Sequence, residues 1–188
     1  AWDGKVFVIG GDNDFNPGTG VSDLVDIYDI ASNTWIGSGT PMPHGRSNLG
    51  YFQTGELLYV VGGWDTAMPS NAAYTERYNM TDDTWEEGPA FTPARADFPI
   101  AVTSQYIYAI GGDADGGGYW DSTNSVWRYD WTQWPGGAWE DTGDPIPAAL
   151  QAMFAGFTTD AVAGGEIWSV GGMNGGTFVW SNANQYRV

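Results

Sequence analysis

Residues 57–63 have the sequence Leu-Leu-Tyr-Val-Val-Gly-Gly, an apolar run that ends in a glycine pair. Similar runs occupy residues 6–11, 106–112 and 167–172, so the arrangement recurs with a period of about 50 residues. Runs rich in Val, Ile and Tyr that stop at glycine are typical of β-strands. The glycine pair permits positive φ angles and a close backbone approach that a side chain would block.

Further signals follow each glycine pair in a fixed order. A tyrosine comes first, a tryptophan follows the first three tyrosines, and a proline-containing turn follows each tryptophan, at residues 40–46, 89–95 and 144–147. This spacing predicts four strands in each repeat: one after the proline turn, then the glycine-pair, tyrosine and tryptophan strands. The repeat positions are Gly10, Gly11, Tyr28, Trp35, Gly62, Gly63, Tyr78, Trp85, Gly111, Gly112, Tyr129, Trp139, Gly171, Gly172 and Tyr186.

The fold class is predicted to be all-β, built from four-stranded antiparallel sheets. No long stretch shows a helical period free of glycine and proline. Each tryptophan is expected to fill the gap between one sheet and the next, because an indole supplies a large apolar surface. Repeat boundaries are expected near residues 1–40, 41–90, 91–144 and 145–188, with the chain starting at a second strand and ending at a third.

This order of apolar strand, Gly-Gly, Tyr-Asp, Trp and Pro-x-Pro-x-x-Arg resembles the Kelch repeat over essentially the whole chain. The resemblance implies that each repeat is a blade of a β-propeller, with its first strand nearest the central channel. Kelch propellers close with roughly six or seven blades, so we expect a segment of a larger propeller. The alternative is a partial propeller whose open edges pair with a second copy.

Composition excludes several classes of function. The 188 residues contain 23 Asp+Glu against 6 Lys+Arg, and the formal net charge of −17 disfavours binding to nucleic acid or to an anionic membrane. No apolar run is long enough for membrane insertion. With no Cys and one His, the two-histidine copper site of Kelch-type oxidases cannot form within this segment. The histidine, His44, is expected to be solvated in its turn, and no catalytic residue is predicted.

Loops after the second and fourth strands of such a blade emerge on one face, which the resemblance implies is the ligand-binding or peptide-binding face. Guanidinium groups there could hold a carboxylate or sugar hydroxyls, or their stems could pack against the turn as part of the repeat. The third turn has no arginine, which leaves Gln151 as a polar substitute. The candidates on this face are Arg46, Arg95, Gln151, Trp64, Asp65, Asp12, Asp14, Asp113 and Asp115.

Two further chemistries remain open on these loops. Asp12, Asp14, Asp113 and Asp115 resemble parts of a calcium loop, but none completes that pattern, and solvated, turn-forming aspartate is the better explanation. Aromatic residues outside the repeat positions could stack on sugar rings, or the insert at residues 131–137 could pack as a small core of its own. These aromatic residues are Trp64, Tyr119, Trp120, Trp131 and Trp134.

The sequence therefore predicts a binding or scaffold module for a protein or a glycan, with no cofactor other than possible calcium. The alternative is the propeller part of a carbohydrate-active enzyme, oxidase-like or mutarotase-like. Strong acidity and a single lysine, Lys5, favour an extracellular or cell-surface prokaryotic protein over a cytoplasmic one.

Overall fold

The computed structural model describes residues 1–12, 20–65, 70–114, 121–150, 154–156, 166–170, 172–174, 177–178 and 183–187. Almost all regular structure within these ranges is β-strand, as predicted, and the exception is a short 3-10 helix, η1 (Trp131–Gln133). None of the described residues belongs to a helix that could cross a membrane.

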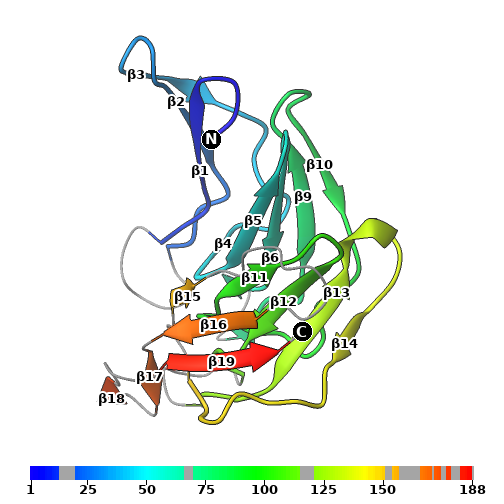
Figure 1. Ribbon diagram of the computed structural model, residues 1–188. Helices are drawn as coiled ribbons and strands as arrows, with labels where there is room; N and C mark the ends of the chain where they lie inside the picture. The colour runs from blue at the N-terminus through cyan, green and yellow to red at the C-terminus, as the bar shows by residue number, and fades with distance from the viewer. Residues whose placement is uncertain are drawn as a thin grey trace.

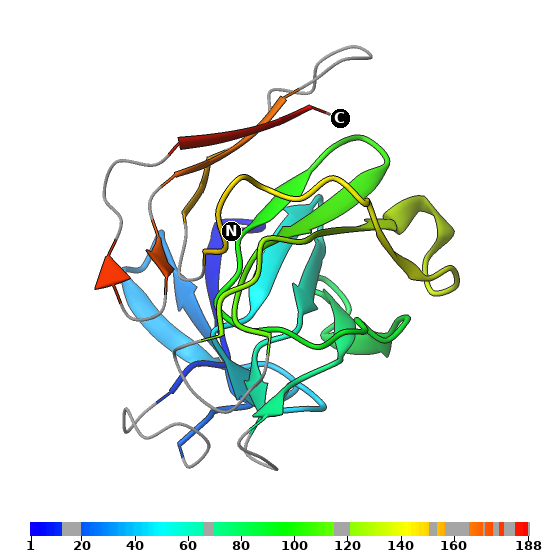
Figure 2. The same cartoon turned by 90° about the horizontal axis from the view of Figure 1, so that it is seen from below.

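Four antiparallel sheets follow one another along the chain, and we call them blades 1 to 4. Figure 1 shows them arranged in chain order around a shared centre, and Figure 2 shows the same order from below. Blade 1 contains β1 (Lys5–Ile9), β2 (Val25–Asp29) and β3 (Thr34–Ser38), and blade 2 contains β5 (Gly50–Thr54), β6 (Leu57–Val61), β9 (Thr75–Asn79) and β10 (Thr84–Glu87). Blade 3 contains β11 (Ile100–Val102), β12 (Tyr106–Ile110), β13 (Val126–Asp130) and β14 (Trp139–Asp141), and blade 4 contains β15 (Phe154–Gly156), β16 (Glu166–Val170) and β19 (Ala183–Arg187). The predicted four-stranded antiparallel sheets are thus confirmed.

Smaller sheets form where the loops meet at one end of the blades. Strands β4 (Arg46–Ser47), β7 (Trp64–Asp65) and β8 (Ser70–Asn71) make one sheet, and β17 (Met173–Asn174) pairs with β18 (Thr177–Phe178). The first of these short ladders joins a proline turn to the segment after a glycine pair.

The inner strands β5, β11 and β15 lie side by side, with β11 in contact with both of the others. Gly50 allows β5 and β11 to approach closely, because a Cβ atom at this position would lie 2.6 Å from Cγ1 of Ile100. Blade 1 has no complete inner strand among the described residues, since β1 pairs only with β2 in its sheet.

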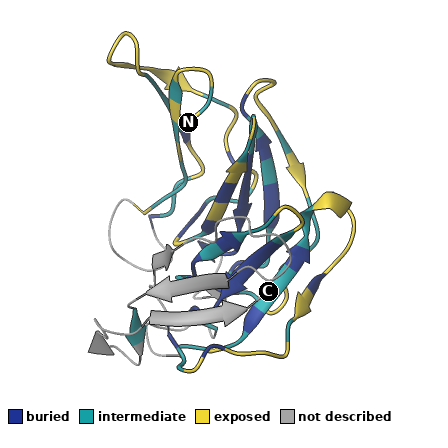
Figure 3. Ribbon diagram, in the orientation of Figure 1, coloured by how far each residue is buried: buried dark blue, intermediate teal, exposed yellow. Residues whose placement is uncertain are grey.

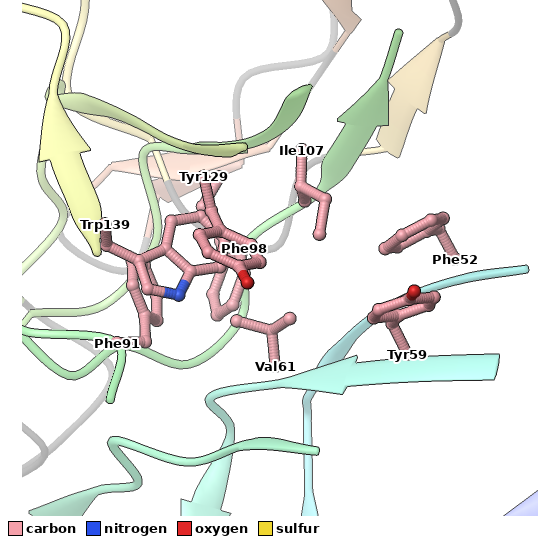
Figure 4. Close-up of a cluster of buried hydrophobic side chains, with 9 residues drawn as sticks. Phe52, Tyr59, Val61, Phe91, Phe98, Ile107, Tyr129 and Trp139 are labelled. Atoms are coloured by element: carbon pink, nitrogen blue, oxygen red, sulfur yellow. The ribbon is translucent and has the colours of Figure 1, made fainter. Parts of the chain in front are cut away.

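The largest hydrophobic core lies between blades 2 and 3 (Figure 4). Trp139 of blade 3 packs with its ring centroid 4.4 Å from that of Phe91 and 5.6 Å from that of Tyr129. Its indole Nε1 donates a 3.1 Å hydrogen bond to Oγ1 of Thr75 in blade 2. The core residues are Phe52, Tyr59, Val61, Phe91, Phe98, Ile107, Ala109, Tyr129 and Trp139.

A second core joins blades 1 and 2 through Phe7, Val25, Leu58 and Tyr78, with Trp85 packed against it. Trp85 and Trp139 therefore each face the preceding blade, which agrees with the predicted filling of the gap between sheets. Trp35 of blade 1 is different, since it is 61% exposed. Figure 3 shows the buried residues concentrated in blades 2 and 3, whereas much of blade 1 is exposed. Trp35 is exposed because no described blade precedes blade 1.

Each described glycine pair holds the backbone where positive φ angles are required. Gly62 and Gly63 have φ angles of 57° and 102°, and a Cβ atom on Gly62 would lie 2.5 Å from the carbonyl oxygen of Arg95. The pair is therefore needed both for its conformation and for the close approach of the next proline turn. Gly171 lies outside the described residues.

Gly62→Ala is expected to destabilise the chain by at least about 2 kcal/mol, because it adds a steric overlap to an unfavourable φ angle. Gly55→Ala is the matched control, since Gly55 has a φ of 56° and a Cβ atom added there would meet nothing within 4 Å. The control should lose only about 1 kcal/mol. Urea unfolding followed by tryptophan fluorescence measures both losses, and equal losses would contradict the steric argument.

Candidate binding face

The structure brings the proline turns and the segments after the glycine pairs together at one end of the blades. Arg46 pairs with Asp65, and Ser47 with Trp64, in the register of β4 and β7. In the neighbouring repeat, Asp113 forms the corresponding bridges to Ala96 and to Ser122. We call this end the loop face.

A repeated backbone hydrogen bond defines which residues of the turns are equivalent. The second glycine of each pair donates to the next turn: Gly11 to the Arg46 carbonyl at 3.1 Å, and Gly63 to the Arg95 carbonyl at 2.7 Å. In the third repeat, Gly112 donates to the Leu150 carbonyl at 2.8 Å. Leu150 is thus the residue at the arginine position. Gln151 is the next residue along and lies outside the described residues.

The Arg46 side chain is completely buried and reaches forward to blade 2. Its Nε donates to the Gly62 carbonyl at 2.8 Å, and one terminal nitrogen donates to the His44 carbonyl at 2.7 Å and to the Glu76 carboxylate. Burial lowers the pKa of the guanidinium, and the charge of Glu76 opposes that shift. Arg46 therefore forms hydrogen bonds to blade 1 through its carbonyl and to blade 2 through its side chain.

Arg95 reaches the equivalent glycine carbonyl between blades 2 and 3, but with a terminal nitrogen instead of Nε. Its terminal nitrogens donate to the Gly111 carbonyl at 3.0 Å and to Oγ of Ser125 at 2.6 Å. The Ser125 hydroxyl takes the role that the Glu76 carboxylate has for Arg46, although Ser125 corresponds to Tyr74 in the strand register. Burial lowers the pKa of Arg95 to about 10. Of the two interpretations drawn from the sequence, these contacts favour a structural role for both arginines. We call the contacts of Arg46 and Arg95 the arginine latch: each carbonyl accepts from the preceding glycine pair, and each guanidinium donates to the following one.

Sequence reasoning did not find the polar cluster around Glu76. His44 stacks on Tyr74 with ring centroids 3.6 Å apart, and its Nδ1 lies 2.7 Å from Oε1 of Glu76. The Glu76 carboxylate is fully buried between His44 and Arg46. His44 is thus held by two partners, so the expectation that it is simply solvated was wrong. The sequence carried no signal for this cluster, since Glu76 stands among polar residues in the stretch Thr-Glu-Arg-Tyr-Asn at residues 75–79.

The other predicted site residues differ in their accessibility. Asp12 is exposed and Asp65 is half-buried, whereas Asp113 is buried and Trp64 is only 8% exposed. Asn71 donates from Nδ2 to the Asp113 carbonyl at 2.7 Å, which joins blade 2 to blade 3 at the loop face. Asp14 and Asp115 lie outside the described residues. Within the part of the chain that the structure describes, no group of three or more metal-binding side chains occurs.

The insert at residues 131–137 reaches from blade 3 back to blade 2. Trp134 lies under the Arg77 guanidinium, 4.9 Å from the ring centroid, and donates from Nε1 to Glu86 at 2.8 Å. Trp131 packs beside Phe52 and donates to the Thr103 carbonyl at 3.1 Å. These contacts favour the packing interpretation of both tryptophans over sugar stacking. Tyr119 and Trp120 lie outside the described residues.

Comparison with known proteins agrees with this architecture. The sequence profile of the Kelch motif matches residues 45–92 and 94–133. Kelch-like protein 22 of Rattus norvegicus is 35% identical over 95 residues, which are 47% of this chain and 15% of that protein. Kelch repeat and BTB domain-containing protein 1 of Cowpox virus (strain GRI-90 / Grishak) is 23% identical over 158 residues, 84% of this chain and 26% of that protein.

Among solved structures, YjhT superimposes with a TM-score of 0.71 at 19% sequence identity. The superposition covers 92% of this chain and 57% of YjhT, which supports the fold. The chain thus spans about a quarter or less of the curated relatives named above, and little more than half of YjhT.

Replacing the two latch arginines by leucine, the residue found at position 150, is expected to have unequal effects. Arg46→Leu leaves the buried Glu76 carboxylate without its guanidinium and should cost about 3 kcal/mol or more. Arg95→Leu leaves only a hydroxyl and a carbonyl oxygen and should cost about 1–2 kcal/mol. Urea unfolding gives both values. The double variant Arg46→Leu/Glu76→Leu should recover part of the loss, and equal losses for the two single variants would contradict this account.

Trp134→Ala is expected to cost about 2 kcal/mol, because it removes the ring that covers Arg77 and Tyr59 across the two blades. Gln133→Ala is the control in the same insert, since Gln133 is exposed, and it should change stability by less than about 0.5 kcal/mol. A thermal melt of both variants tests the difference. A neutral effect of Trp134→Ala would mean that the insert does not brace the blades.

Proposed function

Since this chain belongs to the Kelch-repeat family of β-propellers, we propose that it is a binding scaffold that holds a protein partner against its loop face. The observation that carries the proposal is the anchoring of the loop face by the arginine latch. Buried hydrogen bonds to Gly11, Gly62, Gly63 and Gly111 hold the turns beside the loops. Proline turns that are already anchored pay a smaller ordering cost on binding, which suits recognition of a partner.

A protein partner fits the described side chains better than a glycan does. Sugar recognition commonly uses an open aromatic ring beside polar groups. Trp64 is nearly buried, and Trp131 and Trp134 are engaged within the insert. The enzyme alternative has little support from composition, since the chain has one histidine and no cysteine.

Charge points to a partner with a positive surface. The formal net charge is −17, and each cationic side chain that the structure describes is already buried or paired. Lys5 pairs with Asp3, Arg77 with Glu86 and Arg128 with Glu140, whereas Arg46 and Arg95 are buried in the latch. The surface available to a partner is therefore dominated by carboxylates, and complementary charge favours a basic partner.

A phage-displayed peptide library selected on the chain tests the proposed function. Enriched peptides should be rich in Lys and Arg, and their binding should weaken as salt concentration rises. Asp23→Asn/Asp144→Asn removes two exposed charges next to the loop face and should weaken binding about fivefold or more. Glu56→Gln/Asp82→Asn is the charge-matched control at the opposite loops and should change binding less than about twofold. Equal effects of the two pairs, or binding on a glycan array instead, would overturn the proposal.

We also propose that a further blade covers the sheet face of blade 1 that is turned away from blade 2. This face is formed by Val6, Val8, Tyr28 and Trp35. In the paired strands these positions correspond to Leu58, Val60, Tyr78 and Trp85 of blade 2, which face blade 1. Leu58 and Val60 are buried, whereas Val8 is 48% exposed and Trp35 is 61% exposed. The same sheet face is thus covered in blades 2 and 3 and bare in blade 1.

Sedimentation velocity separates this proposal from association with a second copy. A further blade as the covering element predicts that the chain alone runs at the mass of one molecule and binds an apolar dye at the bare face. Val8→Thr/Trp35→Thr should abolish most of that dye binding. A dimer that dissociates in this double variant would show instead that a second copy covers the face.

We further propose that the protein is extracellular or attached to the cell surface, which its acidity and its single lysine support. Calcium binding by the loop aspartates stays a prediction. Calorimetric titration with calcium tests it directly, and absence of heat at millimolar concentration would exclude all but very weak binding.

A further inference from the structure

We infer that Asp97, held by Asn48 where two neighbouring turns meet at the loop face, is the recognition site for a lysine ammonium group of the protein partner. The inference rests on the proposed function. It adds to the basic partner the residue that binds it and the kind of cationic group that is bound. We call Asp97 and Asn48 the rim pair.

The rim pair lies where two successive proline turns lead into the inner strands. Asn48 comes two residues after Arg46 and Asp97 two residues after Arg95, so they occupy equivalent positions in neighbouring repeats. The Asp97 amide donates a 3.0 Å hydrogen bond to the Asn48 carbonyl, which joins the two turns. The strands that follow, β5 and β11, contact each other. The pair is therefore located at the loop-face end of the inner strands.

The residues of the pair bulge away from the strands that end in the glycine pairs. A Cβ atom on Gly63 would lie 2.4 Å from the Ser47 carbonyl oxygen and 3.0 Å from Cβ of Leu49, so the residues on both sides of Asn48 lie against the glycine. Asn48 and Asp97 themselves have φ angles of 52° and 54°. Asn48 is exposed and Asp97 is half-buried, so a ligand can reach both.

Backbone conformation explains the type of residue at these positions but not the charge of Asp97. Asn and Asp tolerate a positive φ better than most side chains, and Asn48 meets this requirement without a charge. Other carboxylates in turns accept backbone amides, as those of Asp29 and Asp141 do. Among the described residues, the Asp97 carboxylate instead has one hydrogen-bond donor, the side chain of Asn48. Its charge is thus not needed to form the turn.

The Asp97 carboxylate also lacks a counter-charge in the part of the chain that the structure describes. The ion pairs found there all involve other carboxylates. The neighbouring guanidinium groups of Arg46 and Arg95 are held in the latch. Burial raises the pKa of the Asp97 carboxyl, and the hydrogen bond from Asn48 opposes that rise. A half-buried carboxylate gains more from a bound cation than an exposed one does, because less water screens the pair.

The acceptors of the rim pair suit an ammonium better than a guanidinium. Oδ1 of Asp97 accepts from Nδ2 of Asn48, which leaves Oδ2 as the acceptor for a ligand. A guanidinium binds best when it meets both oxygens of a carboxylate in parallel, whereas a compact ammonium needs only one. The carboxamide oxygen of Asn48 is a further acceptor in the same contact. A lysine side chain therefore fits this site better than an arginine side chain.

Titration of the complete chain with Nα-acetyl-lysine amide tests the inference, with NMR detection at the backbone amides of Asp97 and Asn48. Both signals should shift and saturate with a Kd in the roughly millimolar range, because a single charge-assisted contact carries the binding. Nα-acetyl-arginine amide has the same charge and should bind about threefold or more weakly. Unshifted signals at both amides, or equally tight binding of the arginine compound, would overturn the inference.

Asp97→Asn keeps the shape of the side chain and suits the positive φ angle, as Asn48 shows. It should weaken binding of the lysine compound about tenfold or more. Asp82→Asn is the matched control, since it removes the same charge from an exposed turn between β9 and β10, and it should change binding less than about twofold. If Asp97→Asn fails to fold, Asp97→Gly removes the charge with a residue that also accepts a positive φ. Equal effects at positions 97 and 82 would assign the binding to overall charge and contradict the inference.

The peptides selected on the loop face separate this inference from the proposed function. Replacing their lysines by arginine should weaken binding to the unmodified chain and make little difference to the Asp97→Asn variant. Peptides that lose affinity for Asp23→Asn/Asp144→Asn but bind Asp97→Asn as tightly as the unmodified chain would refute the rim pair as the site. The proposed function would stand in that case.

Discussion

The arginine latch is the constraint on which the rest of the structure depends. The Arg46 carbonyl accepts a hydrogen bond from Gly11 in one blade, and its guanidinium donates to the Gly62 carbonyl in the next. A buried charge with several backbone acceptors is strongly directional, so it sets the position of each proline turn as well as joining two sheets. The glycine pairs follow from it, because any side chain at Gly62 would meet the carbonyl of the next turn.

The latch has a backbone hydrogen bond and a side-chain contact, and only the side-chain contact differs from repeat to repeat. The backbone bond recurs at Arg46, Arg95 and Leu150, whereas the side-chain half is an ion pair with Glu76, a bond to the Ser125 hydroxyl, or an apolar contact at Leu150. Backbone geometry is common to all repeats, but a buried charge needs its own partner wherever it occurs. Polar and apolar blade interfaces can therefore coexist in one scaffold without a change in the turn.

The strand order within the repeats and the facing of Trp85 and Trp139 were predictable because they are local or periodic properties of the sequence. Glu76 and the His44–Tyr74 stack were not, since they bring together residues about 30 positions apart whose meeting depends on the packed blades. The sequence likewise could not show that Trp64 is buried while Asp12 is exposed, because both follow a glycine pair. Periodicity specifies the scaffold, whereas the site depends on individual contacts between repeats.

The insert at residues 131–137 has a consequence for how the array comes apart. In a linear array each unit is held by its neighbours, so cooperativity depends on the strength of every interface. Blades 2 and 3 share a large aromatic core and the contact of Trp134 with Arg77. Blade 1 has only one described neighbour. Loss of structure in the described array is therefore expected to spread inward from its ends, while blades 2 and 3 persist together as the last cooperative unit.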